Sequence, residues 1–255
     1  MRKKNLKLKN IIILLLMLIF LIIFVFSLIK IVNYYKDNQK TKEIDNVLKE
    51  SIEYIKEDNK ETSQEITKEK YEVNFNKLKE INKNTVGYLK VLGTNIDYVI
   101  VKGNDNSYYL NHDFNNQYNV LGWPFADFRN KFDGTDKNII IYGHNVKTGV
   151  MFGTLKNVLT SDWQKNTDNQ KLVFITDFEN TTYEVFSTYT IKPEDYYITT
   201  DFNNEEEYQE FLDKISKRSN HNYNVQVSTN DEILTLSSCT NSGLERVVLH
   251  AKKIK

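Results

Sequence analysis

An uninterrupted apolar run near the start is the strongest pattern in the chain. Between Ile11 and Ile29 every residue is apolar except Ser27. Nineteen helical residues span about 28 Å at about 1.5 Å per residue, which matches the hydrocarbon thickness of a bilayer. The run therefore predicts a transmembrane helix over residues 11–32, preceded by a short basic tail over residues 1–10.

A cleavable signal peptide is the alternative interpretation of this segment. Signal peptides carry an apolar region of about 7–15 residues followed by a cleavage site of small residues. The run here is longer, and the only two alanines, Ala126 and Ala251, lie far from it. We therefore favour an uncleaved anchor. Five basic residues precede the run and the first acidic residue is Asp37, so the positive-inside rule predicts a cytoplasmic N-terminus and an extracytoplasmic remainder.

Two helical patterns follow the anchor. An apolar stripe predicts a helix over residues 37–58, and the stripe comprises Ile44, Val47, Leu48, Ile52 and Ile55. A second, more polar helix is predicted over residues 64–82, with three apolar residues facing inward: Phe75, Leu78 and Ile81. We interpret residues 33–71 as a helical stalk that leads to a folded domain over residues 72–255.

Short apolar runs separated by Asn, Asp and Gly dominate the chain from Val86 onward. Seven runs are predicted strands, at residues 86–91, 96–101, 138–142, 171–176, 183–191, 232–238 and 246–254. Such regularly spaced strands indicate a β-sandwich or a closed barrel. One helix is predicted among them over residues 204–218, because acidic residues begin it, basic residues end it and one face is apolar. That face comprises Tyr208, Phe211, Leu212 and Ile215.

Composition and charge narrow the functional classes. The chain is 40% hydrophobic and 27% charged, which permits a folded core and excludes wholesale disorder. Its 34 basic and 34 acidic residues give a net charge of zero, which does not favour a nucleic-acid partner. A single cysteine excludes an intrachain disulfide and any metal site built from several cysteines.

That cysteine, Cys239, is a candidate nucleophile. It ends the predicted strand over 232–238, where a site at the edge of a barrel would be built. A buried, inert thiol is the alternative. His144 is the strongest candidate for its acid–base partner, because it follows the strand over 138–142 through a flexible glycine, Gly143.

The other three histidines are weaker candidates. His112 and His221 lie in Asn-rich polar stretches and are expected to be solvated loop residues. His250 lies on the last predicted strand, roughly 13 Å beyond Arg246 at about 3.3 Å per residue.

Arginine supplies the third candidate. The chain has four arginines against 30 lysines, so lysine is its ordinary surface cation. Arg246 begins an apolar strand seven residues after Cys239. Its planar, permanently charged guanidinium suits hydrogen bonding to an oxygen. A surface charge at the strand end is the alternative.

Three segments together resemble the signature of the sortase family: Tyr142-Gly143-His144-Asn145, Thr235-Leu236-Ser237-Ser238-Cys239 and Arg246-Val247-Val248. Sortases are membrane-anchored cysteine transpeptidases of Gram-positive bacteria. The resemblance covers about residues 72–255 and is closest to class B. Helices precede the strands, a long helix is inserted before the Cys strand, and residues 122–130 resemble the segment ahead of that class's His strand.

Two positions depart from the family pattern. Ser238 precedes the cysteine where the family usually has threonine, a change that keeps the hydroxyl. Asn241 stands where some class B members have an acid. The loop between Cys239 and Arg246 is also short.

The resemblance implies a mainly β fold, a closed eight-stranded barrel with N-terminal helices and one long inserted helix, behind a single transmembrane helix. It implies that Cys239 attacks a C-terminal sorting signal of an exported protein at a Thr-Gly or Thr-Asn bond. Arg246 would stabilise the oxyanion and His144 would protonate the leaving amine. The thioester would pass to an amine of a peptidoglycan cross-bridge or a pilin. Ser238 and Asn145 are implied substrate-binding residues.

No metal or cofactor is implied by this chemistry. The segment from Asp133 to Asp136 lacks the spacing of a calcium loop and predicts a turn.

Two other functional classes share parts of this pattern. Among other Cys/His cell-wall enzymes, L,D-transpeptidases place Ser-His-Gly shortly before the cysteine, and NlpC/P60 peptidases place the cysteine before the histidine. Here Ser237-Ser238 precedes Cys239, and His144 comes first. The remaining alternative is a non-catalytic, membrane-tethered binding module, for which 16 Tyr and 14 Phe would suit a binding surface as well as a barrel core.

Overall fold

A computed structural model describes residues 2–56, 69–194, 196–240 and 243–254. The chain divides into two compact units, Met1–Lys40 and Thr41–Lys255. Helix α1 (Arg2–Lys49) contains the apolar run, and the apolar side chains from Ile11 to Ile29 are all exposed. Apolar surface of this extent is unfavourable in water. In the described part of the chain α1 is the one helix long and apolar enough to cross a membrane.

The helix predicted over residues 37–58 is right only as far as Lys49. Ile44 and Leu48 are buried as expected, but Val47 is exposed. After a turn, β1 (Ile52–Lys56) pairs antiparallel with β2 (Glu69–Val73). Residues that matched a helical stripe therefore form a hairpin, because pairing between strands overrides a weak local periodicity. The second half of the expected helical stalk is thus not helical where it is described.

The second N-terminal helix is shorter than predicted. Residues 64–68 lie outside the described part, residues 69–73 are β2, and α2 spans only Phe75–Ile81. Asn74 begins this helix, since its side chain accepts a hydrogen bond from the backbone N–H of Lys77. Phe75 and Leu78 are buried as predicted, whereas Ile81 at the last turn is exposed.

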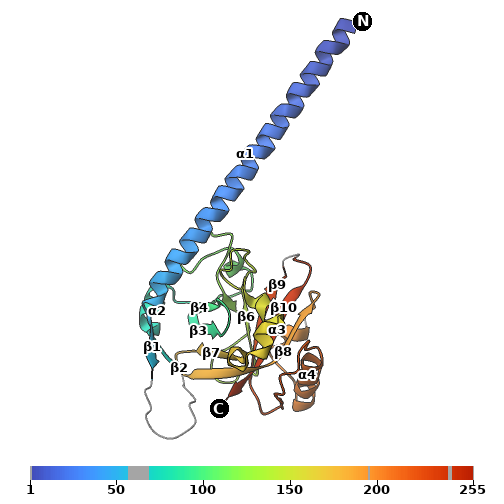
Figure 1. Cartoon of the computed structure of the whole chain (residues 1–255). Helices are drawn as coiled ribbons and strands as arrows, with labels where there is room; N and C mark the ends of the chain where they lie inside the picture. Colours follow the sequence, from blue (N-terminus) through green and yellow to red (C-terminus); the bar gives the residue numbers. More distant parts are fainter. Residues whose placement is uncertain (1, 57–68, 195, 241–242, 255) are drawn as a thin grey trace. The chain divides into compact units, whose positions relative to one another are not determined.

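The other strands close into an eight-stranded barrel (Figure 1) in the order β10-β8-β7-β3-β4-β5-β6-β9. The fold class expected from the sequence is confirmed. Of the two architectures that the strand pattern allowed, the structure is a closed barrel and not a sandwich. The strands are β3 (Thr85–Val91), β4 (Asp97–Lys102), β5 (Phe125–Ala126), β6 (Asn138–Tyr142), β7 (Lys171–Ile175), β8 (Asn180–Ile191), β9 (Ile233–Cys239) and β10 (Arg246–Ile254). All seven predicted strands are present, and among the described barrel strands only the two-residue β5 was missed.

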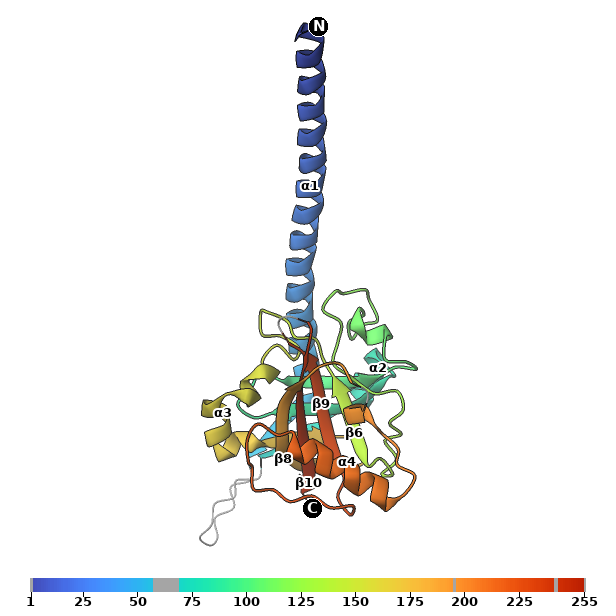
Figure 2. The same ribbon diagram turned by 90° about the vertical axis from the view of Figure 1, so that its right-hand side faces the viewer.

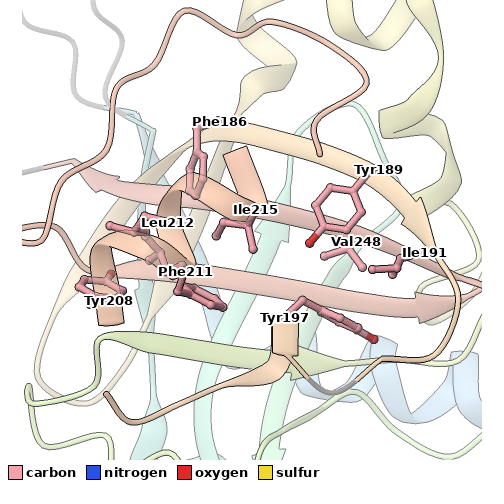
Figure 3. Close-up of a cluster of buried hydrophobic side chains, with 10 residues drawn as sticks. Phe186, Tyr189, Ile191, Tyr197, Tyr208, Phe211, Leu212, Ile215 and Val248 are labelled. Carbon is pink, nitrogen blue, oxygen red and sulfur yellow. The ribbon is translucent and has the colours of Figure 1, made fainter. Parts of the chain in front are cut away.

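Helix α4 (Glu205–Lys217) confirms the helix predicted before the Cys strand. Asn204 caps it by accepting a hydrogen bond from the backbone N–H of Glu207. Figure 3 shows its apolar face packed on side chains of β8 and β10. The buried cluster includes Tyr208, Phe211, Leu212 and Ile215 of the helix, with Phe186, Tyr189, Ile191 and Val248 of the strands. Since burial of each such side chain is worth about 1.5–3 kcal/mol, this face fixes α4 on the barrel.

The remaining described elements are short. They are η1 (Tyr108–Leu110), η2 (Leu155–Leu159), α3 (Ser161–Lys165), η3 (Thr167–Gln170) and η4 (Tyr196–Ile198).

Strand register brings the predicted site residues to one end of the barrel. Strands β6 and β9 are parallel, with Tyr142 opposite Ser237, so their C-terminal ends coincide. Strand β10 runs antiparallel to β9 and begins where β9 ends. Figure 2 shows β6 and β9 running side by side.

Candidate active site

Cys239 and Arg246 face each other across the β9–β10 ladder. Cys239 is the last residue of β9, Arg246 is the first of β10, and their Cα atoms are direct partners. Antiparallel pairing sets such Cα atoms about 4.5–5.5 Å apart. The backbone alone therefore holds the candidate nucleophile beside the candidate oxyanion donor.

The guanidinium of Arg246 rests on the loop that joins these two strands. It is half-buried, and Nη1 donates to the carbonyls of Gly243 at 3.4 Å and Glu245 at 3.2 Å. The loop is closed by a hydrogen bond from the Thr240 N–H to the Glu245 carbonyl. Asn241 lies outside the described residues. A guanidinium has five N–H donors, so these contacts leave donors for a substrate oxygen.

His144 lies just beyond the end of β6 and is half-buried. Its Nε2 is 2.8 Å from the carbonyl of Leu110, and its own carbonyl accepts from the Phe152 N–H at 3.0 Å. A carbonyl oxygen can only accept, so Nε2 carries a proton in this contact. This contact fixes the orientation of the His144 imidazole ring beside the end of β6.

Ser238 joins the Cys strand to the His loop. Its hydroxyl is buried and donates to the Gly143 carbonyl at 2.7 Å, while the Gly143 N–H donates to the Ser237 carbonyl at 3.3 Å. A Cβ at Gly143 would overlap the ring of Phe152, so glycine is required here by close approach. Ser238 therefore fixes the spacing between the residues that precede Cys239 and His144.

Asn145 follows His144 and is also half-buried. It forms an isolated antiparallel bridge with Met151, which closes the loop that begins at the end of β6. The substrate-binding roles of Asn145 and Ser238 stay predictions.

The described contacts of the other three histidines are with residues outside this constellation. His250 is fully buried, with Nε2 2.8 Å from the Tyr189 hydroxyl and Nδ1 2.8 Å from the Thr235 hydroxyl. Burial lowers the pKa of His250 to about 3, so it is neutral at physiological pH. His112 and His221 are half-buried rather than solvated, because each packs on a tyrosine ring.

Sequence reasoning missed a buried carboxylate beside the site. Asp127 is fully buried and accepts from Arg129 Nε at 2.8 Å and Nη2 at 2.7 Å, from the Tyr142 hydroxyl at 2.8 Å and from Asn106 Nδ2 at 2.9 Å. Burial alone would raise the pKa of Asp127, but these hydrogen bonds outweigh it and the pKa lies below its usual value. Burial and the Asp127 charge raise the pKa of Tyr142, which therefore stays neutral.

A signal for this cluster was present in the sequence. Arg129 is another of the four arginines in a lysine-rich chain, and the argument that singled out Arg246 applies equally to it. It also lies within residues 122–130, the segment that carried part of the class B resemblance.

The segment from Asp133 to Asp136 forms the predicted turn. The Asp133 carboxylate accepts from the backbone and hydroxyl of Thr135, and the Asp136 carboxylate accepts from the N–H groups of Lys131 and Phe132. Across the described residues, no group of three or more His, Cys, Asp or Glu side chains is arranged to hold a metal ion.

Comparison with known proteins places this geometry in a family. The sortase domain model matches residues 89–254. Sortase B of Staphylococcus aureus is 37% identical over 184 residues, which cover 71% of this chain and 75% of that protein. The chain belongs to the sortase family, in class B. The sortase is thus a cysteine transpeptidase, and the non-catalytic and other peptidase classes are set aside.

Solved structures agree with this assignment. Sortase B of Bacillus anthracis in complex with AAEK1 is 34% identical with a TM-score of 0.72, and the match covers 88% of this sortase and 99% of that chain. A sortase B complexed with triglycine is 36% identical with a TM-score of 0.67, over 71% of this sortase and 85% of that chain.

Proposed function

We propose that this sortase cleaves a C-terminal sorting signal of exported proteins at a Thr-Gly or Thr-Asn bond and transfers the acyl group to a cell-wall or pilin amine. The observation that supports the proposal is the register that brings Cys239, Arg246 and Tyr142, two residues before His144, to one barrel end. Each candidate then has a role that its position permits.

In the first half-reaction the Cys239 thiolate attacks the carbonyl carbon of the scissile bond. A C–S bond forms, and negative charge on the oxygen is stabilised by Arg246 donors not used by the loop carbonyls. The C–N bond then breaks, and the leaving amine takes one proton from protonated His144, which becomes a neutral imidazole. In the second half-reaction an acceptor amine attacks the thioester, the C–S bond breaks, and the amine proton returns to His144.

The acceptor amine is proposed to be the terminal amine of a peptidoglycan cross-bridge. The triglycine complex of a related sortase B supports this choice, because triglycine presents a free amine on a flexible, unbranched chain. A pilin lysine is the alternative acceptor, with its amine on a longer side chain. Ser238 and Asn145 are proposed to contact the substrate backbone.

Membrane anchoring is proposed to hold the enzyme at the site of export. Residues 1–10 would remain in the cytoplasm, residues 11–32 would cross the membrane, and the catalytic domain over 72–255 would lie outside. The apolar, exposed segment of α1 and the basic residues before it support this topology. Protease added to intact, wall-stripped cells should remove the catalytic domain. Degradation only after lysis would reverse the orientation.

The catalytic proposal is tested with the full-length enzyme in detergent. Incubation with a peptide library and mass spectrometry of the acyl-enzyme should identify the sorting motif and place the acyl group on Cys239. Cys239→Ala should abolish both cleavage and transfer, and His144→Ala should be severely impaired. His221→Ala, which removes a histidine packed on the Tyr223 ring, should stay near wild type. Activity in Cys239→Ala or in His144→Ala would overturn the assignment. Supplying triglycine or a lysine peptide as acceptor distinguishes the two amines.

A further inference from the structure

The buried carboxylate of Asp127 connects segments that lie far apart in the sequence. Asn106 comes from the loop after β4, Arg129 follows β5, and Tyr142 ends β6. The side-chain amide oxygen of Asn106 also accepts from the Phe128 N–H at 3.0 Å, so Asn106 is bonded both to Asp127 and to the residue after it. The Asp127 carboxylate thus forms hydrogen bonds with side chains from three separate segments of the chain.

One arm of this network reaches the strand ends that carry the site. Tyr142 donates to Asp127 Oδ2 at 2.8 Å and is separated from His144 only by Gly143. Across the β6–β9 ladder its partner is Ser237, which lies two residues before Cys239. Tyr142 thus links the Asp127 carboxylate to the backbone segment that leads to His144.

The other arm reaches η4. Arg129 Nη2 donates to the Ile198 carbonyl at 2.8 Å while it binds Asp127. Tyr197, the neighbour of Ile198, has its hydroxyl 3.1 Å from the Ser237 hydroxyl. The contacts thus form a closed ring that runs from Asp127 through Arg129, η4 and β9 to β6 and back to Asp127.

We propose that Asp127 and Arg129 are positioning residues for transpeptidation, and that their ion pair fixes the end of β6, and with it His144, relative to η4 and β9. The inference rests on the proposed role of His144 as the group that protonates the leaving amine. Neither residue needs to touch the substrate. A misplacement of about 1 Å in a reacting group can cost on the order of 100-fold in rate, so such a ring can control catalysis from outside the site.

The chemistry of the pair favours this role over simple stabilisation. Asp127 is fully buried while Arg129 is exposed, and burying the carboxylate carries a desolvation cost that an apolar residue would avoid, so this ion pair is weak evidence for stability alone. Arg129 bonds both carboxylate oxygens and the Ile198 carbonyl at once. A lysine ammonium lacks the planar fork that this arrangement needs, although lysine is the chain's ordinary cation.

Arg129→Lys, Asp127→Asn and Tyr142→Phe test the inference in the full-length enzyme in detergent. The substrate is the peptide identified by acyl-enzyme trapping, in its natural amide form and with the scissile amide replaced by a thioester. A thiolate leaving group needs no proton from His144. We expect kcat for the amide to fall about 10- to 100-fold in Arg129→Lys, with KM within about 3-fold. On the thioester the same variant should lose less than about 3-fold.

Asp97→Asn is the matched control. Asp97 accepts from the Tyr88 hydroxyl at 2.6 Å and from Lys90 at 3.0 Å. Like Asp127, it is therefore a carboxylate that binds one tyrosine and one cation, but it lies on β4 and its partners lie on β3. We expect this variant to keep the wild-type kcat on both substrates. Thermal unfolding of every variant is measured alongside. If Asp127→Asn does not fold, Tyr142→Phe still tests the network, because it removes one hydrogen bond to Asp127 and keeps the carboxylate.

The possible outcomes separate this inference from the proposed function. Activity in Cys239→Ala or His144→Ala would remove the proposed function itself. If those two variants are inactive and Arg129→Lys cleaves the amide within about 3-fold of wild type, only the positioning role is overturned. Equal losses on amide and thioester, or losses that follow unfolding, would make the ion pair purely structural and would equally overturn it.

Discussion

The Ser238 hydroxyl donates a 2.7 Å hydrogen bond to the Gly143 carbonyl, so the residues immediately before Cys239 and His144 are joined to each other. The two strands that carry them are parallel neighbours, and the bond lies just past their last pair, Tyr142 and Ser237. This bond between a side chain and the backbone therefore continues the β6–β9 pairing by one residue beyond the last strand pair.

Ser238→Ala should weaken both catalysis and stability. The change leaves the Gly143 carbonyl without its buried donor, which costs about 1 kcal/mol of unfolding free energy, and frees the loop before His144. We expect about a 10-fold loss in kcat/KM on the identified peptide. Ser238→Thr keeps the hydroxyl and should retain most of the activity. Full activity in Ser238→Ala would show that backbone pairing alone sets the spacing.

Gly143→Ala should be more damaging than its size suggests. The added Cβ would overlap the buried ring of Phe152, so either the ring or the His144 loop must move. Overpacking of this kind costs about 1–3 kcal/mol. We expect kcat to fall at least 10-fold, and Phe152→Leu in the same chain to restore part of it. A double variant no more active than Gly143→Ala would place the cause outside this contact.

The sequence was most informative where structure is local. The strands of the barrel are short apolar runs bounded by turn residues, and β6 and β10 begin and end where they were predicted. The two-residue β5 leaves no run to detect. The β1–β2 hairpin was predicted as helix because Ile52 continued the helical spacing of Ile44 and Leu48, and pairing with the next strand along the chain decided otherwise.

The residues of the candidate site also differ in whether a local sequence pattern reveals them. Cys239, His144 and Arg246 could be predicted as site residues because each lies at or just beyond the end of a predictable strand and matches a family motif. Asp127 was missed because its importance comes from partners at residues 106 and 142, which no local pattern joins. Burial of a carboxylate and its full set of donors are properties of the folded barrel alone.

Arg246→Ala should reduce kcat about 100- to 1,000-fold, or roughly 3–4 kcal/mol, if its donors stabilise the oxyanion. Arg246→Lys keeps the charge but loses the planar fork, so it should recover only part of the loss. Arg246 is half-buried at a strand end and leaves no large cavity, so thermal unfolding should change little. Steady-state cleavage with a thermal melt of each protein checks this. Cleavage within a few-fold of wild type would place the oxyanion donor elsewhere.

His250 should make the barrel sensitive to acid. The ring is fully buried between the hydroxyls of Tyr189 and Thr235, and its pKa is lowered from 6.5 to about 3. Below pH 6.5 the unfolded chain therefore binds a proton that the folded chain does not, and stability falls as the pH drops towards 3. From these two pKa values the contribution is about 2 kcal/mol between about pH 7.5 and about pH 5. His250→Gln carries no titrating group, so it should be less stable at about pH 7.5 but lose about 2 kcal/mol less than wild type on acidification. Urea unfolding of both proteins at the two pH values measures this difference. An equal loss in both would show that other groups cause the acid sensitivity.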